Sequence, residues 1–145
     1  QLVYSGDFVM NHMDLLTGYV DLSIQTGVTS PDYRVFTKSK DSIVNRFYLY
    51  IFQMCYLRKI FYGLGRGVST LGRWRLPSIE FLNFKLPLPD RNEQTQIVEY
   101  LDEKTQKIDS TIEKETKRIE LLKEYRQSLI SEVVTGKVDV REWNN

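Results

Sequence analysis

The sequence predicts an α+β fold, in which a small mixed globular domain is followed by one long helix of the coiled-coil-forming kind. Two observations predict this class. Within residues 1–89, short alternating segments surround one longer apolar segment. Within residues 90–136, apolar side chains instead recur at steps of three and four, which is the period of a helix that pairs with another helix. We therefore expect three parts, namely a globular domain (1–89), a long helix (90–136) and a C-terminal tail (137–145).

The globular part contains segments whose apolar and polar residues alternate, as they do in half-buried strands. Three such segments are residues 7–11, 18–24 and 33–37. Glycine and proline punctuate residues 27–31, which predicts a turn before the third strand.

A longer apolar segment follows the predicted strands. Residues 45–62 are too long and too evenly apolar for a strand, so they predict a buried helix or a pair of helices. The clustered glycines of residues 63–67 end this segment, because glycines in series do not sustain a helix. After a polar loop, we expect a short turn near residues 77–81 and a last strand over residues 83–88.

Capping signals mark both ends of the long helix. Asp90 is a candidate N-cap and Glu93 lies three residues later, which is the spacing of a capping box behind Pro89. Gly136 is a candidate C-terminal stop, and Lys137 lies near the negative end of the helix. Between these limits, alternate steps of three and four define what we call the seam: Val98, Leu101, Thr105, Ile108, Ile112, Glu115, Ile119, Leu122, Arg126, Leu129 and Val133.

The seam is buried only if another helix lies against it. Its two central charges indicate the direction of that helix. In an antiparallel pair whose facing residue numbers sum to 241, Glu115 meets Arg126 of the partner and the neighbouring layers are apolar. In a parallel pair in register, Glu115 would face its own copy, which costs stability. The sequence therefore favours an antiparallel partner, as a homodimer if the chain is isolated. A solitary helix is the alternative, and it would leave the seam in water.

Charge is distributed unevenly along the chain. Residues 1–89 carry ten lysines and arginines against six aspartates and glutamates, and no acidic residue occurs between Asp41 and Glu80. A basic surface without internal neutralisation raises the local concentration of polyanions and supplies phosphate contacts. An ordinary solvated face is the alternative interpretation.

The loop of residues 63–75, GLGRGVSTLGRWR, is the best candidate for contacting DNA. Arginine makes bidentate contacts to guanine, serine and threonine contact phosphates or bases, and glycine lets the backbone approach the duplex. The candidate residues are Arg66, Ser69, Thr70, Arg73 and Arg75, with Lys38 and Lys40 as further DNA-binding candidates and Arg46 beside them. The alternative is a flexible loop in which Trp74 packs on the core.

Enzymatic chemistry is not favoured, and no cofactor or metal is expected. His12 is the only histidine, which excludes a multi-histidine metal site or a Ser-His-Asp triad within one chain, and we expect it to be a polar turn residue. Asp102 and Lys104 imitate part of a nuclease signature, but residues two apart on one helix do not face each other.

The single cysteine, Cys55, lies in the apolar segment, so we expect its thiol to be buried. No membrane span or signal peptide is visible, so we expect a cytoplasmic protein.

One set of motifs resembles a known family. The set comprises LPLP at residues 86–89, Glu93-Gln94, Ile97-Val98, YLDEKT at 100–105, LISE at 129–132 and TGKVDVR at 135–141. This run resembles the second half of the DNA-specificity subunit of type I restriction-modification systems, in which LPLP closes a target-recognition domain and the helix forms the arm joining it to its partner half. Such domains are usually longer than 89 residues, so the resemblance implies that this one is truncated at its N-terminal end.

The resemblance also implies partners and a role. The family's subunit reads a few base pairs of a split double-stranded DNA target, and its two conserved helices pair antiparallel, normally within one polypeptide. Two modification (methyltransferase) subunits clamp on and supply the S-adenosylmethionine chemistry, while restriction subunits supply ATP-driven cleavage. The chain itself is then a non-catalytic recognition and scaffold subunit. A coiled-coil assembly module without DNA affinity and a nuclease are the alternatives.

Overall fold

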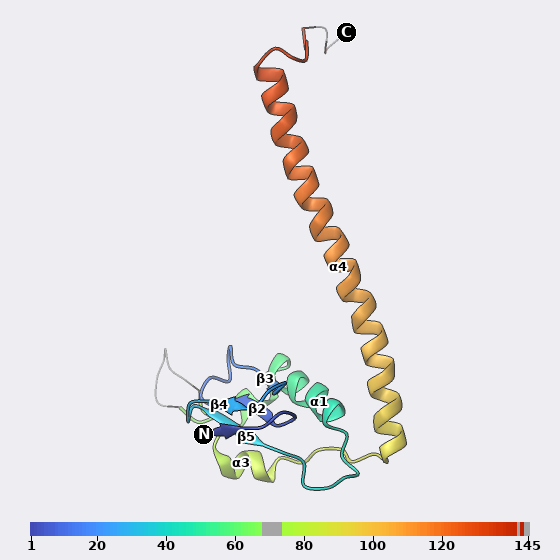
Figure 1. The fold of residues 1–145 in the computed structure, drawn as a ribbon. Helices are drawn as coiled ribbons and strands as arrows, with labels where there is room; N and C mark the ends of the chain where they lie inside the picture. The colour runs from blue at the N-terminus through green and yellow to red at the C-terminus, as the bar shows by residue number, and fades with distance from the viewer. Residues whose placement is uncertain (68–73, 142, 144–145) are drawn as a thin grey trace. The chain divides into compact units, whose positions relative to one another are not determined.

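The structure is a computed structural model that describes residues 1–67, 74–141 and 143. It separates into two compact units, Gln1–Glu99 and Tyr100–Asn145. Small antiparallel sheets and short helices make up the first unit, and a single long helix dominates the second. The α+β class is therefore confirmed (Figure 1).

Three of the predicted strands form one antiparallel sheet. Strand β2 (Phe8–Asn11) lies at its centre, between β3 (Val20–Leu22) and β5 (Tyr33–Phe36). In β2 the side chains of Phe8 and Met10 are buried and their neighbours are partly exposed. This alternation is the period of two that predicted the strand.

A second sheet pairs two very short strands. Strand β1 (Leu2–Val3) runs antiparallel to β4 (Gly27–Val28), and the Thr29 amide donates to the Gln1 carbonyl oxygen at 2.9 Å. The turn predicted over residues 27–31 thus begins as a strand. The sequence of this stretch carries turn residues, but its backbone is paired because the start of the chain lies beside it.

The long apolar segment folds as two helices, which is the second of the two predicted alternatives. Helix α1 (Asn45–Leu57) and helix α2 (Ile60–Gly63) are separated by Lys59, whose φ of 58° is left-handed and interrupts helical hydrogen bonding. Helix α1 packs against the three-stranded sheet (Figure 1). Cys55 on α1 is buried as expected, and burial raises the pKa of its thiol.

Aromatic side chains build the core between α1 and the sheet. Phe52 of α1 is central, because its ring centroid lies 5.5 Å from those of both Phe8 and Phe36, each edge-on to it. Phe61 and Phe81 close the same cluster at 6.3 and 6.0 Å from Phe52. Aromatic pairs at these separations add specific attraction to the area that they bury.

The prediction for residues 77–88 is wrong in two places. Helix α3 (Ser78–Asn83) replaces the predicted turn, and residues 84–88 are extended but form no strand. Pro87 has no amide hydrogen to donate to a neighbouring strand. The alternation in this segment instead reflects Phe84 and Leu86, which pack against the core from one side.

Helix α4 (Arg91–Val134) has 44 residues, which makes it about 66 Å long. Its N-terminus is capped as predicted, since the Glu93 amide donates to Asp90 Oδ1 at 3.0 Å. Gly136 follows the helix with a φ of 74°, the left-handed conformation that ends helices. Among the described residues, no helix combines the length and the apolar composition that a membrane crossing requires.

Gln94 joins the first turn of α4 to the loop before α1. Its side chain is completely buried, and Oε1 accepts a hydrogen bond from the Val44 amide at 2.9 Å. Its Nε2 donates to the carbonyl oxygens of Ser42 and Pro89 at 3.2 and 2.9 Å. Val44 is the N-cap residue of α1 and has no capping side chain of its own. Gln94 therefore satisfies one of the amides that the start of α1 leaves unpaired.

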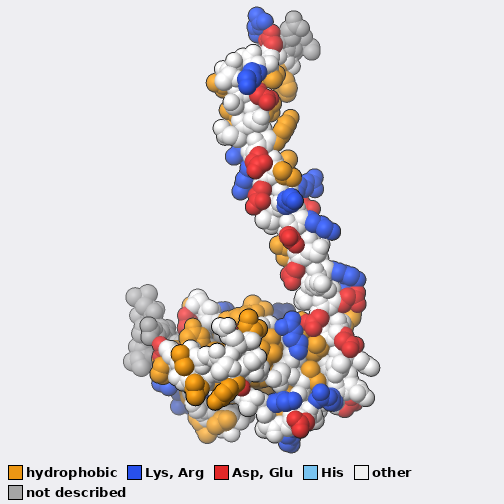
Figure 2. Space-filling view, viewed as in Figure 1, with side chains coloured by type: hydrophobic (Ala, Val, Ile, Leu, Met, Phe, Trp, Pro, Cys, Tyr) orange, Lys and Arg blue, Asp and Glu red, His pale blue; other side chains and the backbone are white. Residues whose placement is uncertain are grey.

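Beyond Glu99, most of the seam is open to solvent in the single chain. Hydrophobic side chains recur along this part of α4 between acidic and basic ones (Figure 2). In the single chain, the seam residue Leu122 is 57% exposed, and its neighbour Leu121, which lies outside the seam, is 56% exposed. Without a second helix, seam leucines are therefore no more buried than other leucines of α4. The predicted burial of the seam by a second helix stays a prediction.

We predict that Gln94→Leu lowers the free energy of unfolding of the first unit by about 3 kcal/mol, because the Val44 amide and two carbonyls lose a buried partner. Gln96→Leu is the matched control, since Gln96 is exposed on the same helix turn. Urea denaturation followed by near-ultraviolet circular dichroism measures both. Equal effects of the two substitutions would contradict the role assigned to Gln94.

Candidate nucleic-acid interface

The predicted DNA-contacting loop is closed at its base by two backbone hydrogen bonds. The Arg66 amide donates to the Arg75 carbonyl oxygen at 2.8 Å, and the Arg75 amide donates to the Arg66 carbonyl oxygen at 3.1 Å. These two residues thus face each other at the ends of the loop. The other candidates, Ser69, Thr70 and Arg73, lie outside the described residues.

Trp74 anchors the base of the loop. Its ring stacks on Tyr62 with centroids 5.3 Å apart, and its Nε1 donates to the Tyr62 carbonyl oxygen at 2.5 Å. The Leu15 amide donates to the Trp74 carbonyl oxygen at 3.1 Å. Trp74 therefore packs on the core, as the alternative interpretation of the loop expects. This packing also holds the adjacent Arg75 in place.

Gly65 allows this packing. A Cβ added at Gly65 would lie 2.1 Å from Cδ1 of Trp74 and 2.9 Å from Cδ1 of Leu15. Both distances are far below van der Waals contact. Gly65 is therefore required because a larger side chain would collide with Trp74 and Leu15, and not only because it lies in a loop.

The base of the loop gathers positive charge. The Arg34 Nη2 atom donates to the Leu76 carbonyl oxygen at 3.1 Å and to Ser78 Oγ at 3.2 Å, and its guanidinium lies 4.7 Å from the ring centroid of Phe81. Burial and the nearby Arg75 lower the pKa of Arg34. Sequence reasoning missed Arg34, although it is the one charged residue in the strand predicted over residues 33–37.

His12 lies beside the same charges. It is buried rather than a polar turn residue, and the Leu76 amide donates to its backbone carbonyl oxygen at 2.9 Å. Burial lowers its pKa, and the charges of Arg34 and Arg75 lower it further. A neutral His12 therefore adds no third positive charge to this place at pH 7.

Asp41 and Glu80 are the acidic residues at either end of the stretch that contains no aspartate or glutamate. Each forms an ion pair with one of the basic candidates. Glu80 Oε1 lies 2.8 Å from Arg66 Nη2, and Asp41 Oδ1 lies 3.7 Å from Lys38 Nζ. The expectation of a surface without internal neutralisation is therefore wrong for Arg66 and Lys38. No carboxylate of the described residues pairs with Arg75.

Lys38 and Lys40 form a group separate from the base of the loop. They follow β5, both are exposed, and Lys38 contributes to the edge of a cavity. No hydrogen bond found among the described residues joins either lysine to Arg66 or Arg75. The structure therefore divides the candidates into a loop group and a group after β5.

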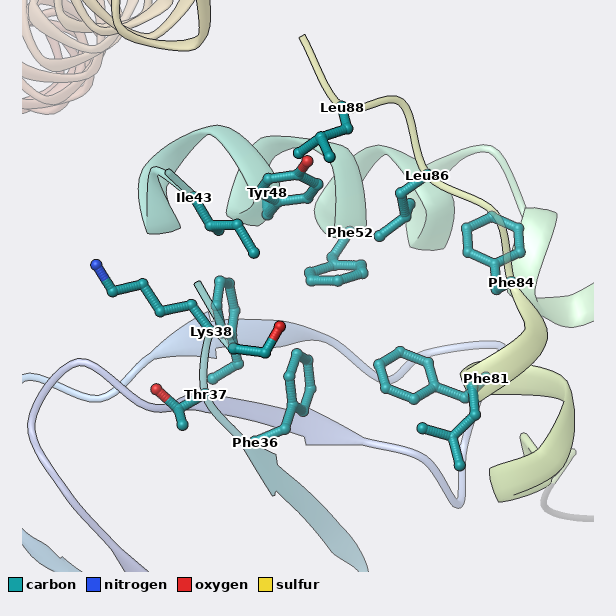
Figure 3. Close-up of a pocket in the computed structure, with 13 residues that line it drawn as sticks. Phe36, Thr37, Lys38, Ile43, Tyr48, Phe52, Phe81, Phe84, Leu86 and Leu88 are labelled. Carbon is teal, nitrogen blue, oxygen red and sulfur yellow. The ribbon is translucent and has the colours of Figure 1, made fainter. Parts of the chain in front are cut away.

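The cavity lies among α1, β5 and the segment that follows α3, and has a volume of about 350 Å³ (Figure 3). Aromatic and aliphatic side chains dominate its lining: Phe8, Phe36, Ile43, Tyr48, Phe52, Phe81, Leu82, Phe84, Leu86 and Leu88, with Thr37, Lys38 and Ser39 at its edge. This lining contains no carboxylate, histidine or cysteine that could act as a general base or nucleophile. Nor do the described residues contain a cluster of three or more potential metal ligands.

The nuclease signature falls on helix α4. Asp102 and Lys104 lie within its continuous run, two residues apart, as the sequence predicted. A metal-dependent nuclease needs its acidic groups to converge on an ion, which two positions on one helix do not provide.

The model of one protein family, the type I restriction modification DNA specificity domain, matches residues 2–123. The match covers the globular unit, the loop and more than half of α4. The chain belongs to this family. Specificity domains are in general not catalytic. Arg34 lies within the matched residues, and its guanidinium is bonded within the domain to the Leu76 carbonyl oxygen and Ser78 Oγ.

We predict that Gly65→Ala destabilises the specificity domain by about 1–3 kcal/mol, because the added methyl group forces Trp74 off Tyr62. Gly63→Ala is the matched control, since a Cβ there would meet nothing within 4 Å. Urea denaturation measures the stability, and tryptophan fluorescence in a Trp143→Phe background reports exposure of the Trp74 ring. A Gly65→Ala protein as stable as Gly63→Ala would contradict the packing argument.

Proposed function

We propose that this chain is the DNA-sequence recognition and scaffold subunit of a type I restriction-modification methyltransferase. Residues 1–89 form the target-recognition domain, residues 90–136 form the helical arm, and residues 137–145 form the tail. Double-stranded DNA is the ligand, modification subunits bind the scaffold, and a restriction subunit joins indirectly. The observation that carries this proposal is the family match over residues 2–123.

The loop group is the proposed place of DNA contact. Arg75 is exposed, has no carboxylate partner in the described part of the chain, and stands where two hydrogen bonds fix its backbone. The fixed backbone limits where the guanidinium can reach, so less backbone freedom is lost when Arg75 binds. Arg73, Ser69 and Thr70 are proposed contacts on sequence grounds alone.

Arg66 is expected to contribute less than Arg75. Its guanidinium already lies 2.8 Å from Glu80, so binding a phosphate or a base exchanges one charged partner for another. Lys38 is in a similar position beside Asp41, while Lys40 remains a proposed contact.

The coiled-coil module without DNA affinity is the less favoured function. It accounts for α4 but not for the family match, which begins at residue 2 and includes the whole loop. DNA binding that weakens as salt rises separates the two functions, because released counterions make such binding salt-dependent.

The proposed helix partner is antiparallel. In the single chain Glu115 Oε2 lies 3.7 Å from Arg118 Nη1, an exposed pair that contributes little to stability. Pairing with Arg126 of a second copy would place the same carboxylate in a less hydrated layer between apolar ones. An isolated chain is therefore expected to dimerise, and a helix from a first half of the subunit would occupy the same seam in a longer polypeptide.

We predict that changing Arg73 and Arg75 together to alanine weakens binding of the assembled methyltransferase to its target duplex by about 1–3 kcal/mol for each arginine that reads a base. Arg66→Ala should cost less, and Glu80→Gln should strengthen binding by releasing Arg66. Fluorescence anisotropy titrations at several salt concentrations measure these affinities. Unchanged affinity and site preference in the double variant would move recognition to Lys38, Lys40 and Arg46.

We predict that Leu122→Ser weakens self-association of the chain by about 2 kcal/mol, because a seam leucine is buried in the pair. Leu121→Ser is the matched control, since the two leucines are adjacent and almost equally exposed in the single chain. Sedimentation equilibrium measures the dimer dissociation constant. Equal effects at the two positions would argue against the seam.

The direction of pairing has its own control. Arg126→Glu should weaken the dimer, and adding Glu115→Arg should recover much of the loss by restoring an opposite pair. No coupling in this double-mutant cycle would exclude the register in which facing numbers sum to 241.

A further inference from the structure

The chain makes a sharp turn immediately after α4. The Lys137 amide donates to the Glu132 carbonyl oxygen at 2.8 Å and the Gly136 amide donates to that of Val133 at 3.1 Å. This pair of bonds, with Gly136 left-handed, is a Schellman motif. The Val138 amide also donates to the Glu132 carbonyl oxygen at 3.2 Å, so the motif holds the following residues at the C-terminal end of the helix.

Two further interactions shape the segment after the motif. Asp139 Oδ1 accepts hydrogen bonds from the amide and the Nε atom of Arg141 at 3.0 and 2.9 Å. The Trp143 amide donates to the Val140 carbonyl oxygen at 3.2 Å. We call the described residues 138–141 and 143 the return segment.

The return segment and the helix enclose an apolar hollow of about 410 Å³. Its lining consists of Leu129, Val133, Val138, Asp139, Val140 and Trp143. Leu129 and Val133 are the last two positions of the seam, so the hollow is continuous with the apolar surface proposed for pairing. Trp143 is 82% exposed, which leaves the largest apolar side chain of the hollow facing solvent.

The antiparallel register identifies what would lie at this level. With facing numbers summing to 241, Leu129 meets Ile112 of the second copy and Val133 meets Ile108. Ile108 is 58% exposed in the single chain. The complementary charges of Glu115 and Arg126 set this alignment twice in a symmetric pair, once on each side of its centre.

We infer that the return segment is part of the pairing interface and that the hollow receives Ile108 of a second copy of this chain. This inference rests on the proposed antiparallel pairing. Val138 and Val140 form the wall opposite the helix, and Trp143 covers the inserted side chain. Each end of the pair then has one such hollow, so two sites form together in the symmetric dimer.

The position of the return segment has a physical reason. A two-helix coiled coil exposes the flanks of its terminal layers, where no further turn of helix covers them. A tryptophan beside the last layer removes more apolar area from water than any other side chain could. The segment thus covers the layer that helix pairing alone leaves least protected.

We predict that Trp143→Ala in the 145-residue chain raises the dimer dissociation constant about tenfold in sedimentation equilibrium. Val134→Ala is the matched control, since Val134 is 79% exposed and lies outside both the seam and the hollow. Because Trp143 lies outside the helix, the helical content by circular dichroism should be unchanged. Subtracting the emission spectrum of Trp143→Ala from that of the wild type gives the emission of Trp143. This emission should shift to shorter wavelength as the dimer forms, because the ring leaves water.

A double-mutant cycle locates the interaction. If Ile108 fills the hollow, Trp143→Ala in an Ile108→Ala background should cost clearly less than tenfold. Independent effects that simply multiply would overturn the inference, and so would a tighter dimer in Trp143→Ala, which would mean that the segment competes with the partner. A wild-type chain that stays monomeric would overturn the pairing itself, while DNA binding by the assembled methyltransferase tests the proposed recognition separately.

Discussion

The buried side-chain amide of Gln94 is the constraint on which the organisation of the first unit depends. It is completely enclosed and uses one acceptor and two donor hydrogens in bonds to Val44, Ser42 and Pro89. No shorter or apolar side chain reproduces three bonds to two separate stretches of backbone, residues 42–44 and Pro89. The start of α4 is thereby tied to the start of α1, and α1 carries Phe52, on which the aromatic core converges.

The aromatic core positions the loop that is proposed to contact DNA. Phe61 and Phe81 belong to the elements that flank the loop, so the packing of their rings sets where the loop leaves and re-enters the domain. Trp74 and Tyr62 then fix the base, and the backbone pair of Arg66 and Arg75 closes it. Packed aromatic rings therefore stabilise the base of the loop, and the side chains proposed to contact DNA are basic residues exposed beside it.

Periodicity predicted the elements that are defined by their own residues. The strand at Phe8 and the length of α4 were predictable because burial follows a period of two or a helical repeat. The length of the apolar segment predicted helical structure over residues 45–62, but not the break at Lys59. The strand expected over residues 83–88 was wrong because apolar alternation does not reveal whether a neighbouring strand exists. Within the site, Arg75 could be named from composition, whereas Arg34 and the Arg66–Glu80 pair depend on contacts between residues distant in sequence.

The backbone closure of the loop separates the content of the loop from the integrity of the domain. Arg66 and Arg75 are held by main-chain atoms, which are the same whatever side chains lie between them. Exchanges that keep Trp74, whose ring stacks on Tyr62, therefore leave the base of the loop, Gln94 and Phe52 unchanged. For a loop proposed to contact DNA, this arrangement means that the contacting side chains can change while the fold that holds the two ends of the loop stays the same.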